Sequence, residues 1–383
     1  MRYSRVRIAS LGYTLPEERV TSDELESRLA PLYERLKLPE GRLELMTGIS
    51  ERRFFAPGTR IGEVSVDSGR LALRAAGIDP GEIGALIHGS VCRDHLEPAT
   101  AARVHFELGL PAECHVFDVS NACLGLLTGA LQIANLIELG QIRAGLVVGT
   151  ENGRPLVEHT IDSLNRDTAL TRRSVKSAVA SLTIGSGSCA ILLADESLCP
   201  DGSPLVGGAV RAETRHHQLC QSGSDEAGAD MRPLMATDSE QLMREGVAVG
   251  AATFEQLLYE TGWQREDLQR TFCHQVGAAH RKLMLDSLGL PVENDFCTLQ
   301  WLGNTGSVAL PITLSAGADA GEIQSGQNAG LLGIGSGIHC VMLGVQWRTT
   351  PVLGATRTSR TDQAAAAPPV PLGARGAMRS LLN

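Results

Sequence analysis

The stretch ELGLPAECHVFDVSNACLG, residues 107–125, returns in altered form later in the chain as SLGLPVENDFCTLQWLGNTG, residues 287–306. The shared LGLP begins at Leu108 and again at Leu288, so the two stretches are offset by 180 residues. Internal similarity at a fixed spacing is the signature of a duplicated structural unit. The sequence therefore predicts a fold built from two related halves.

The same offset relates two turns of the chain. Residue 123, a cysteine, corresponds at this offset to Gly303, the residue next to Asn304. In the first half an apolar strand, residues 114–120, runs into Cys123 and then directly into a helix predicted over residues 124–140. We interpret the cysteine turn and the GNTG turn as equivalent strand-to-helix connections. In a duplicated fold such turns lie on facing loops around a pseudo-twofold axis.

Apolar strand candidates alternate with amphipathic helical segments along the chain. The strand candidates are residues 85–91, 114–120, 144–150, 188–194, 329–337 and 339–347. Near-continuous apolar strands interleaved with helices indicate sheets covered on both faces. The predicted fold class is therefore α/β.

Three regions follow from the repeat and from a change in composition. We predict an N-terminal half over residues 1–200 with the cysteine, and a C-terminal half over residues 201–348 with His274 and Asn304. Residues 349–383 are rich in Ala, Pro, Arg and Gly with little periodicity, which is typical of a disordered tail. We expect this tail to be dispensable for chemistry.

Composition and charge exclude several classes of protein. The 383 residues carry a net charge of −9 and no basic stripe, which argues against nucleic acid as a partner. The nine cysteines include no C-x-x-C pair, so neither a disulfide framework nor a metal site is predicted. GSGSCA leads into a strand rather than a helix, which argues against a dinucleotide cofactor. No apolar run suits a signal peptide or a transmembrane helix, and we expect a cytoplasmic protein.

Five places in the chain offer chemistry, and each also has a structural interpretation. Cys123 stands at a helix start that would lower its thiol pKa, although a buried cysteine is equally compatible with the local pattern. His274 follows a short apolar strand, Asn304 lies between glycines and Glu97 lies in a loop before a helix. Structural, conformational and solvated roles are the usual ones for such residues. Backbone N–H groups of LLGIGSGIHC, residues 331–340, could form an oxyanion hole.

Four motifs in order resemble the ketoacyl synthase III branch of the thiolase superfamily over about residues 1–348. They are TGISERRF (47–54), DVSNACLG (118–125), HQVGAAH (274–280) and GNTGS (303–307), with HQV where HQA is usual in this branch. The resemblance implies a thiolase fold, a duplicated five-layered αβαβα arrangement, in homodimers that condense acyl thioesters. It implies a Cys123–His274–Asn304 triad, with an oxyanion hole at the backbone of Cys123 and Gly335.

One departure narrows the resemblance. Chain-initiating ketoacyl synthases have an aromatic residue about 26 positions before the cysteine, which reaches into the partner's pocket, and this sequence has Glu97 there. With a glutamate at this position, the sequence resembles the OleA-type enzymes, which join two fatty acyl-CoA molecules head to head. A malonyl donor generates its carbanion by losing CO₂, whereas a simple acyl-CoA must lose an α-proton to a positioned base. The resemblance implies that Glu97 of the neighbouring subunit is this base.

The sequence therefore predicts an acyltransferase that performs a non-decarboxylative Claisen condensation of two long-chain acyl-CoA molecules. The product is a 2-alkyl-3-ketoacyl compound, the first step towards a long-chain olefin or a β-lactone, with downstream pathway enzymes as further partners. No cofactor or metal is implied. Three alternatives stay open: a decarboxylative 3-oxoacyl-ACP synthase III that uses malonyl-ACP, an acyl-CoA:alcohol acyltransferase, and a non-catalytic partner subunit of a heterodimer.

Overall fold

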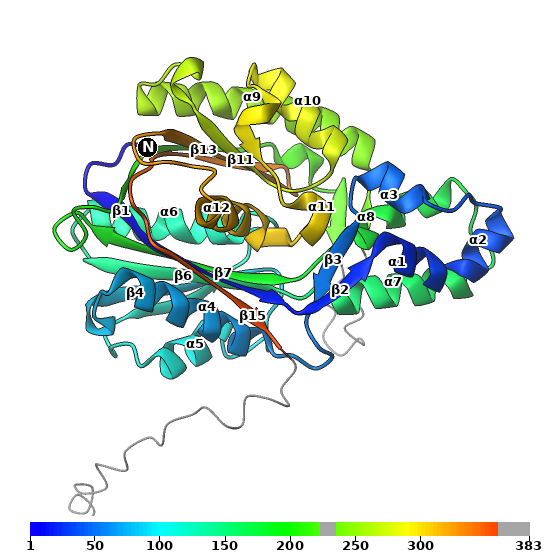
Figure 1. Ribbon diagram of the computed structural model, residues 1–383, viewed down its shortest axis with the longest axis horizontal. Coiled ribbons are helices and arrows are strands. Elements are labelled where there is room, and N and C mark those ends of the chain that lie inside the picture. Colours follow the sequence, from blue (N-terminus) through cyan, green and yellow to red (C-terminus); the bar gives the residue numbers. More distant parts are fainter. Residues whose placement is uncertain (223–234, 359–383) are drawn as a thin grey trace, which may run out of the picture.

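Two joined sheets, one of six strands and one of five, form the body of the protein in a computed structural model that describes residues 1–222 and 235–358 (Figure 1). The first sheet has the order β5-β4-β6-β7-β1, with β15 (Val352–Arg357) also paired with β1, and the second has the order β8-β14-β13-β11-β12. Short pairing between β1 and β8 joins them. Besides β15, the strands of the first sheet are β1 (Val6–Pro16), β4 (Ile83–Gly89), β5 (His115–Val119), β6 (Ala144–Glu151) and β7 (Gly187–Asp195). Those of the second are β8 (Ser203–Ala212), β11 (Arg270–Cys273), β12 (Asp295–Phe296), β13 (Asn328–Gly335) and β14 (His339–Gln346).

Helices lie between the sheets and on both outer faces (Figure 1). The central helices are α6 (Gly125–Glu138) and α12 (Ala309–Asp319), and both are mostly buried. Helices α4 (Ile61–Ala76) and α5 (Thr100–Leu108) cover the first sheet, whereas α9 (Ser239–Thr261) and α10 (Ala278–Leu288) cover the second. Strands β6 and β7 are buried at every position because helices cover both faces of their sheet. The five-layered αβαβα arrangement predicted from the sequence is confirmed.

The 180-residue offset of the sequence is visible in the elements. When 180 is added to their residue numbers, β5 overlaps β12, α5 overlaps α10, and α6 overlaps the segment that contains α12. The shared LGLP ends α5 and α10 with the same turn, because Gly109 (φ 65°) and Gly289 (φ 67°) both take the left-handed conformation that favours glycine after a helix. The first sheet holds strands from residues 6–195 together with the strand of residues 352–357, and the second holds strands from 203–346. The division into halves over residues 1–200 and 201–348 stays a prediction.

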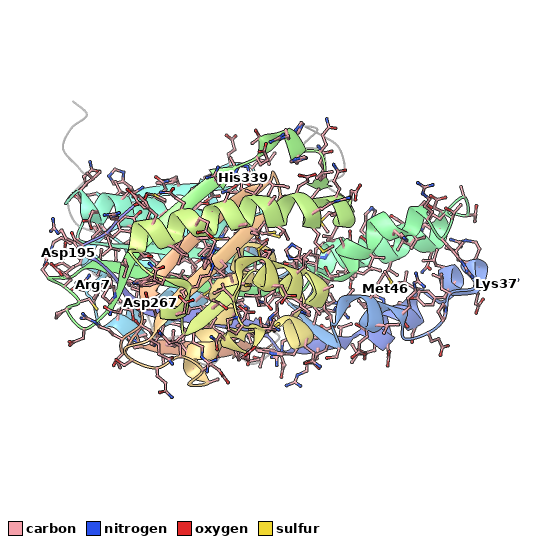
Figure 2. The ribbon with its side chains drawn as sticks, turned by 90° about the horizontal axis from the view of Figure 1, so that it is seen from above. Arg7, Lys37, Met46, Asp195, Asp267 and His339 are labelled. Carbon is pink, nitrogen blue, oxygen red and sulfur yellow. The ribbon has the colours of Figure 1, made fainter. Side chains whose placement is uncertain are left out.

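A lobe projects from one end of the layered body (Figure 1). It consists of α1 (Ser22–Arg28), α2 (Ala30–Leu36), α3 (Arg42–Thr47), α7 (Arg154–Arg166), α8 (Val179–Leu182) and the pair β2 (Glu18–Thr21) and β3 (Glu51–Phe54). It has a small core of its own, with Leu25, Leu32, Phe54, Val157 and Ile161 among its buried residues. Figure 2 shows the labelled Lys37 and Met46 at this end of the molecule. Among the described residues, no helix is long and apolar enough to cross a membrane.

The segment after residue 349 begins with a strand, which corrects the prediction of a tail that is disordered throughout. Strand β15 (Val352–Arg357) pairs in parallel with β1, from Leu11 beside Val352 to Pro16 beside Arg357. Thr350 is buried, and its hydroxyl lies 2.5 Å from that of Ser203. The strand pairs largely through its backbone, so its mixed side chains gave no periodic pattern to recognise. Residues 359–383 of the predicted tail lie outside the described residues.

Ending the chain at Arg348 is therefore expected to lower the free energy of unfolding, by about 2–4 kcal/mol. The loss has two sources, the backbone hydrogen bonds of β15 and the ion pairs of Arg357 with Glu63 and Asp67 on α4. Thermal melts should show a lower midpoint for this chain than for one ended after Thr358. Equal midpoints would show that β15 and its ion pairs add nothing to stability. The prediction that the tail is dispensable for chemistry is tested separately, by the rate of the truncated chain on acyl-CoA.

Candidate active site

Cys123 lies in a tight connection between β5 and α6. Ala122 precedes it with φ of 44°, a left-handed conformation that is unfavourable for a residue with a Cβ. The turn is held by the N–H of Leu124, which donates to Asn121 O at 2.9 Å, and by Asn121 Nδ2, which donates to Thr128 Oγ1 at 2.9 Å. Backbone strain that its surroundings hold in place is frequent at functional sites. The strand-to-helix elbow predicted from the sequence is present.

The thiol of Cys123 is neutral at rest. Loss of surrounding water raises its pKa to about 12, and the nearby Cys220 and Glu151 also raise it. The N–H groups of Cys123 and Ser336 act in the opposite direction. The expectation that the helix start would lower this pKa is therefore wrong, because burial outweighs the helix terminus. A base must take the proton when the sulfur attacks.

His274 is a histidine that β11 and β13 hold in the interior. It follows β11 directly, and its N–H donates to Leu332 O of the neighbouring β13 at 3.2 Å. Burial lowers the pKa of its imidazole to about 3, with a further contribution from His280, so the ring is neutral near neutral pH. Its Nδ1 is buried and has no hydrogen-bond partner within the described residues. A buried, neutral imidazole with an open nitrogen suits proton transfer with a bound group.

Asn304 is held by hydrogen bonds that orient its side chain. Its N–H donates to Thr183 O and its carbonyl accepts from Gly185 N–H, both at 2.9 Å. Its Oδ1 accepts from the N–H of Gly306 at 2.9 Å, which leaves Nδ2 as the group that can donate to a ligand. The side chain is buried, so such a bond would form away from bulk water.

The glycine-rich turn lies against the nucleophile. A Cβ built on Gly335, at the end of β13, would lie 3.5 Å from the Cβ of Cys123. The next residue, Ser336, directs its backbone N–H towards the sulfur of Cys123. Strand β13 thus brings Cys123 and His274 to one end of the second sheet, because Leu332 and Gly335 are about 10 Å apart along it. The oxyanion role of Gly335 stays a prediction, and Ser336 joins it as a candidate donor.

Glu97 stands apart from these groups within one protomer. It lies in the exposed loop between β4 and α5, and no hydrogen bond or ion pair of its carboxylate occurs within residues 1–222 and 235–358. The structure of a single chain brings Cys123, His274 and Gly335 together around β13, and it leaves Glu97 facing solvent.

Glu151 is a buried carboxylate beside the nucleophile that sequence reasoning missed. Its oxygens accept from the N–H of Val91 at 2.9 Å, the N–H of Cys92 at 3.1 Å and the hydroxyl of Ser307 at 2.6 Å. It therefore joins the start of the Glu97 loop to the turn of Asn304. In the sequence the only signal was an acidic residue at the end of the apolar segment AGLVVGT.

Comparison with known proteins identifies the family. Residues 46–197 match the thiolase N-terminal domain, and residues 258–347 match the C-terminal domain of 3-oxoacyl-[acyl-carrier-protein] synthase III. The acyl-CoA:acyl-CoA alkyltransferase of Shewanella oneidensis is 44% identical over 351 residues, 91% of this chain and 100% of that protein. The protein of the same name from Xanthomonas campestris is 33% identical over 347 residues, with the same coverage.

Solved structures agree with the sequence relatives. Xanthomonas campestris OleA with bound lauric acid and lauroyl-CoA superposes with a TM-score of 0.84 at 33% identity, covering 90% of this chain and 100% of that chain. Structures of that protein include variants at a glutamate and at a cysteine 26 residues after it. The fold, the two matching family models and these relatives define a condensing enzyme of the thiolase superfamily. Within it, the chain belongs to the family of the acyl-CoA:acyl-CoA alkyltransferases, the OleA proteins.

Proposed function

We propose that the protein joins two long-chain acyl-CoA molecules by a non-decarboxylative Claisen condensation, and that it does so as a homodimer. The observation that carries the proposal is Glu97, a solvent-facing carboxylate 26 residues before the nucleophile. The same spacing separates the glutamate and the cysteine that were varied in Xanthomonas campestris OleA. A malonyl-dependent synthase has no use for a carboxylate base there, whereas an acyl-CoA donor needs one.

The first step transfers an acyl group to Cys123. The sulfur attacks the thioester carbonyl of the first acyl-CoA while the neutral imidazole of His274 accepts the thiol proton. Backbone N–H groups of Cys123 and of the Gly335–Ser336 turn stabilise the oxyanion. The bond to the CoA sulfur breaks, CoA takes the proton from His274 as it leaves, and the histidine returns to its neutral form.

The second step forms the carbon–carbon bond. Glu97 of the partner protomer removes a proton from C2 of the second acyl-CoA, and Asn304 Nδ2 and His274 donate hydrogen bonds to the enolate oxygen. The enolate carbon attacks the carbonyl of acyl-Cys123, and the carbon–sulfur bond of that thioester breaks. The product is a 2-alkyl-3-ketoacyl-CoA. Glu97 gives up the proton that it removed and the released thiolate of Cys123 takes up one proton from solvent, so both groups return to their starting forms. Enzymes that convert this product to an olefin or a β-lactone are the expected downstream partners.

The homodimer is supported by an apolar edge next to the Glu97 loop. Strand β5 is an edge strand of the first sheet, and its free side can pair with another strand. Large apolar side chains are exposed on it or near it, namely Val91, Leu96, Phe106 and Phe117. Exposed apolar surface beside an unpaired strand favours association with a second copy of the chain. Such a dimer would carry the loop of each protomer towards its partner.

A small cationic hollow in the lobe, about 20 Å³ in volume, is the feature that favours a phosphate-bearing acyl carrier such as CoA. The side chains that line it are Leu38, Arg42, Met46, Arg172, Val175, Lys176 and Val179. Arg172 is held in place because it donates to the carbonyls of Leu36 and Lys37. The hollow has room for little more than a water-sized group, so its three cations, Arg42, Arg172 and Lys176, offer charge for a phosphate of CoA at the surface rather than a pocket for the whole carrier. The nine cysteines are all free thiols, which suits a reducing compartment such as the cytoplasm.

Incubation of the purified protein with one acyl-CoA and no malonyl donor tests the proposal. Mass spectrometry is expected to detect a 2-alkyl-3-ketoacyl product with the carbon atoms of two acyl chains, or the ketone that forms when its free acid loses CO₂. A product that appears only with malonyl-ACP would establish the decarboxylative synthase instead. Acylation of Cys123 without any condensation in either mixture would contradict both functions.

A further inference from the structure

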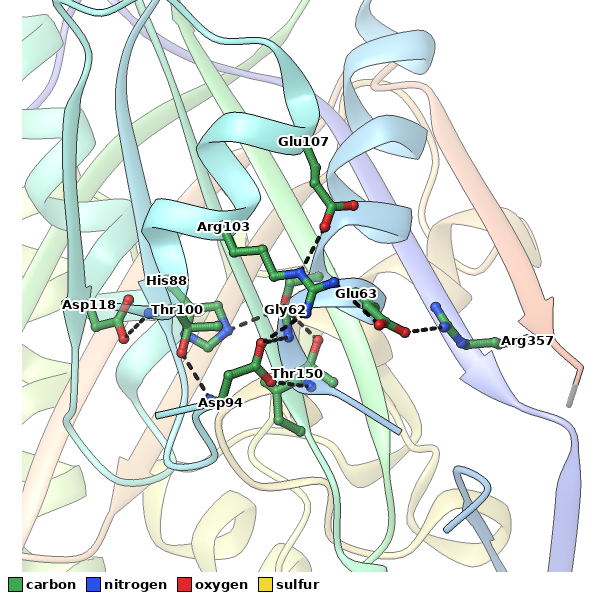
Figure 3. Close-up of polar contacts among 12 residues, drawn as sticks. Gly62, Glu63, His88, Asp94, Thr100, Arg103, Glu107, Asp118, Thr150 and Arg357 are labelled. Carbon is green, nitrogen blue, oxygen red and sulfur yellow. Dashed lines mark hydrogen bonds and ion pairs between the residues drawn. The ribbon is translucent and has the colours of Figure 1, made fainter. Parts of the chain in front are cut away.

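Asp94, three residues before Glu97, forms hydrogen bonds that hold the Glu97 loop against the body of the protein (Figure 3). Asp94 Oδ1 accepts from the N–H of Ile61 at 2.7 Å, and Oδ2 accepts from the N–H of Gly62 at 3.2 Å. These two N–H groups open α4 and have no partner within the helix, and the helix terminus favours a negative charge. The N–H of Asp94 donates to the hydroxyl of Thr100 at the start of α5, at 3.2 Å. Asp94 therefore joins the loop to two helix starts.

A row of side chains with alternating charge extends from Asp94 across α5 and α4 to β15 (Figure 3). Arg103 of α5 lies 3.8 Å from Asp94 Oδ2 and 3.3 Å from Glu63 Oε1. Glu63 in turn pairs with Arg357 of β15, at 3.2 Å. Three of the four side chains, those of Asp94, Glu63 and Arg357, are at most 14% exposed. Pairs so shielded from solvent are screened less by salt than surface pairs are. The cluster thereby connects the C-terminal strand to the loop.

Space for Asp94 exists only because residue 62 is a glycine. A Cβ built on Gly62 would lie 2.6 Å from Asp94 Oδ2 and 3.0 Å from Arg103 Cδ. Gly62 stands in α4 with an ordinary helical conformation, so its lack of a side chain serves this close approach and not a turn. Any larger residue would push the carboxylate away from the helix start.

We propose that Asp94 is a positioning residue for the condensation step, because it determines where the loop presents Glu97. Of the loop residues from Arg93 to Pro98, only Asp94 is not exposed, so it is the nearest anchor for Glu97. Three residues of chain span at most about 11 Å, which limits how far Glu97 can move while Asp94 is held. The proposal rests on the function assigned above to Glu97. Arg103, Glu63 and Arg357 act through Asp94.

Two variants test the proposal without touching the base. Gly62→Ala keeps every charged group and displaces Asp94, and Asp94→Asn leaves an amide nitrogen facing either a backbone N–H or Arg103. Both are expected to form acyl-Cys123 at nearly the wild-type rate and to condense about 10- to 100-fold more slowly, since a small misplacement of a catalytic group has effects of this size. Gly246→Ala is the matched control, because a Cβ at Gly246 would meet no atom nearer than 3.7 Å. Single-turnover measurements with one acyl-CoA separate the two rates.

The outcomes distinguish this proposal from the proposed function. If Glu97→Gln blocks condensation while Gly62→Ala and Asp94→Asn condense at the wild-type rate, the positioning role is wrong and the base assignment stands. If acylation and condensation fall together in both variants, Asp94 serves the fold in general, which also overturns the proposal. If Glu97→Gln itself condenses normally, the proposed function fails first, and the positioning role has no base to position.

Discussion

Replacing Cys123 with alanine is expected to abolish covalent acylation of the protein by acyl-CoA. Cys123 is the thiol at the elbow between β5 and α6, beside the Gly335–Ser336 turn and with its neutral proton acceptor, His274, on the adjoining strands. Alanine has no group that can form a thioester, so the adduct is lost if Cys123 is the acylated thiol. Intact-protein mass spectrometry after incubation with acyl-CoA should show the acyl adduct on the wild type and none on Cys123→Ala.

Cys220 provides the matched control for this experiment. It is the neighbouring thiol whose charge affects the pKa of Cys123, and it accepts a hydrogen bond from Thr237. Cys220→Ala should therefore keep the adduct. An acyl mass on Cys123→Ala would show that the nucleophile has been misassigned, and loss of the adduct on Cys220→Ala with Cys123 intact would point to Cys220.

The architecture was predictable because it repeats within the chain. One offset relates β5 to β12 and α6 to α12, and the strands that form the sheet interiors are apolar along their length. Strands β1 and β15 were not predicted, and interactions that leave no apolar pattern help to hold them in place. Strand β1 includes Ser10, whose hydroxyl donates to Ala72 O at 2.7 Å, and β15 is mostly exposed and pairs through its backbone. Backbone pairing leaves no periodic pattern in a sequence.

For the candidate site, the sequence could name only the groups proposed to react. Cys123, His274 and Asn304 could be identified because they lie in the motifs that carry the resemblance, which implies that their side chains take part in the chemistry. The groups around them could not be found that way. Glu151 and Asp94 act through backbone N–H groups, which every residue has, so only the folded structure reveals their partners. The direction of the Cys123 pKa was also wrong, since burial is a property of the packed site and not of the helix start.

Glu97→Gln is expected to separate the two chemical steps. The variant should still form acyl-Cys123, which needs only the thiol and His274, but it should condense about 10²- to 10⁴-fold more slowly, the usual effect of removing a general base. The exposed Glu266, which lies far along the chain in a short helical turn after α9, supplies the control variant Glu266→Gln. Adduct mass and product formation are followed in the same reaction. Condensation by Glu97→Gln at nearly the wild-type rate would favour the malonyl-dependent alternative.

Mixing protomers then determines from which chain the base comes. Glu97→Gln and Cys123→Ala homodimers each lack one essential group in both sites and should be inactive in condensation. After subunit exchange, a heterodimer has one site with the cysteine of one chain and the glutamate of the other, so about a quarter of the wild-type activity should return at statistical mixing. The exposed position of Glu97 in a single protomer is the reason to expect rescue. If mixing restores no activity although mass spectrometry detects the heterodimer, the base acts within its own chain, and the loop must close over the site of the same protomer.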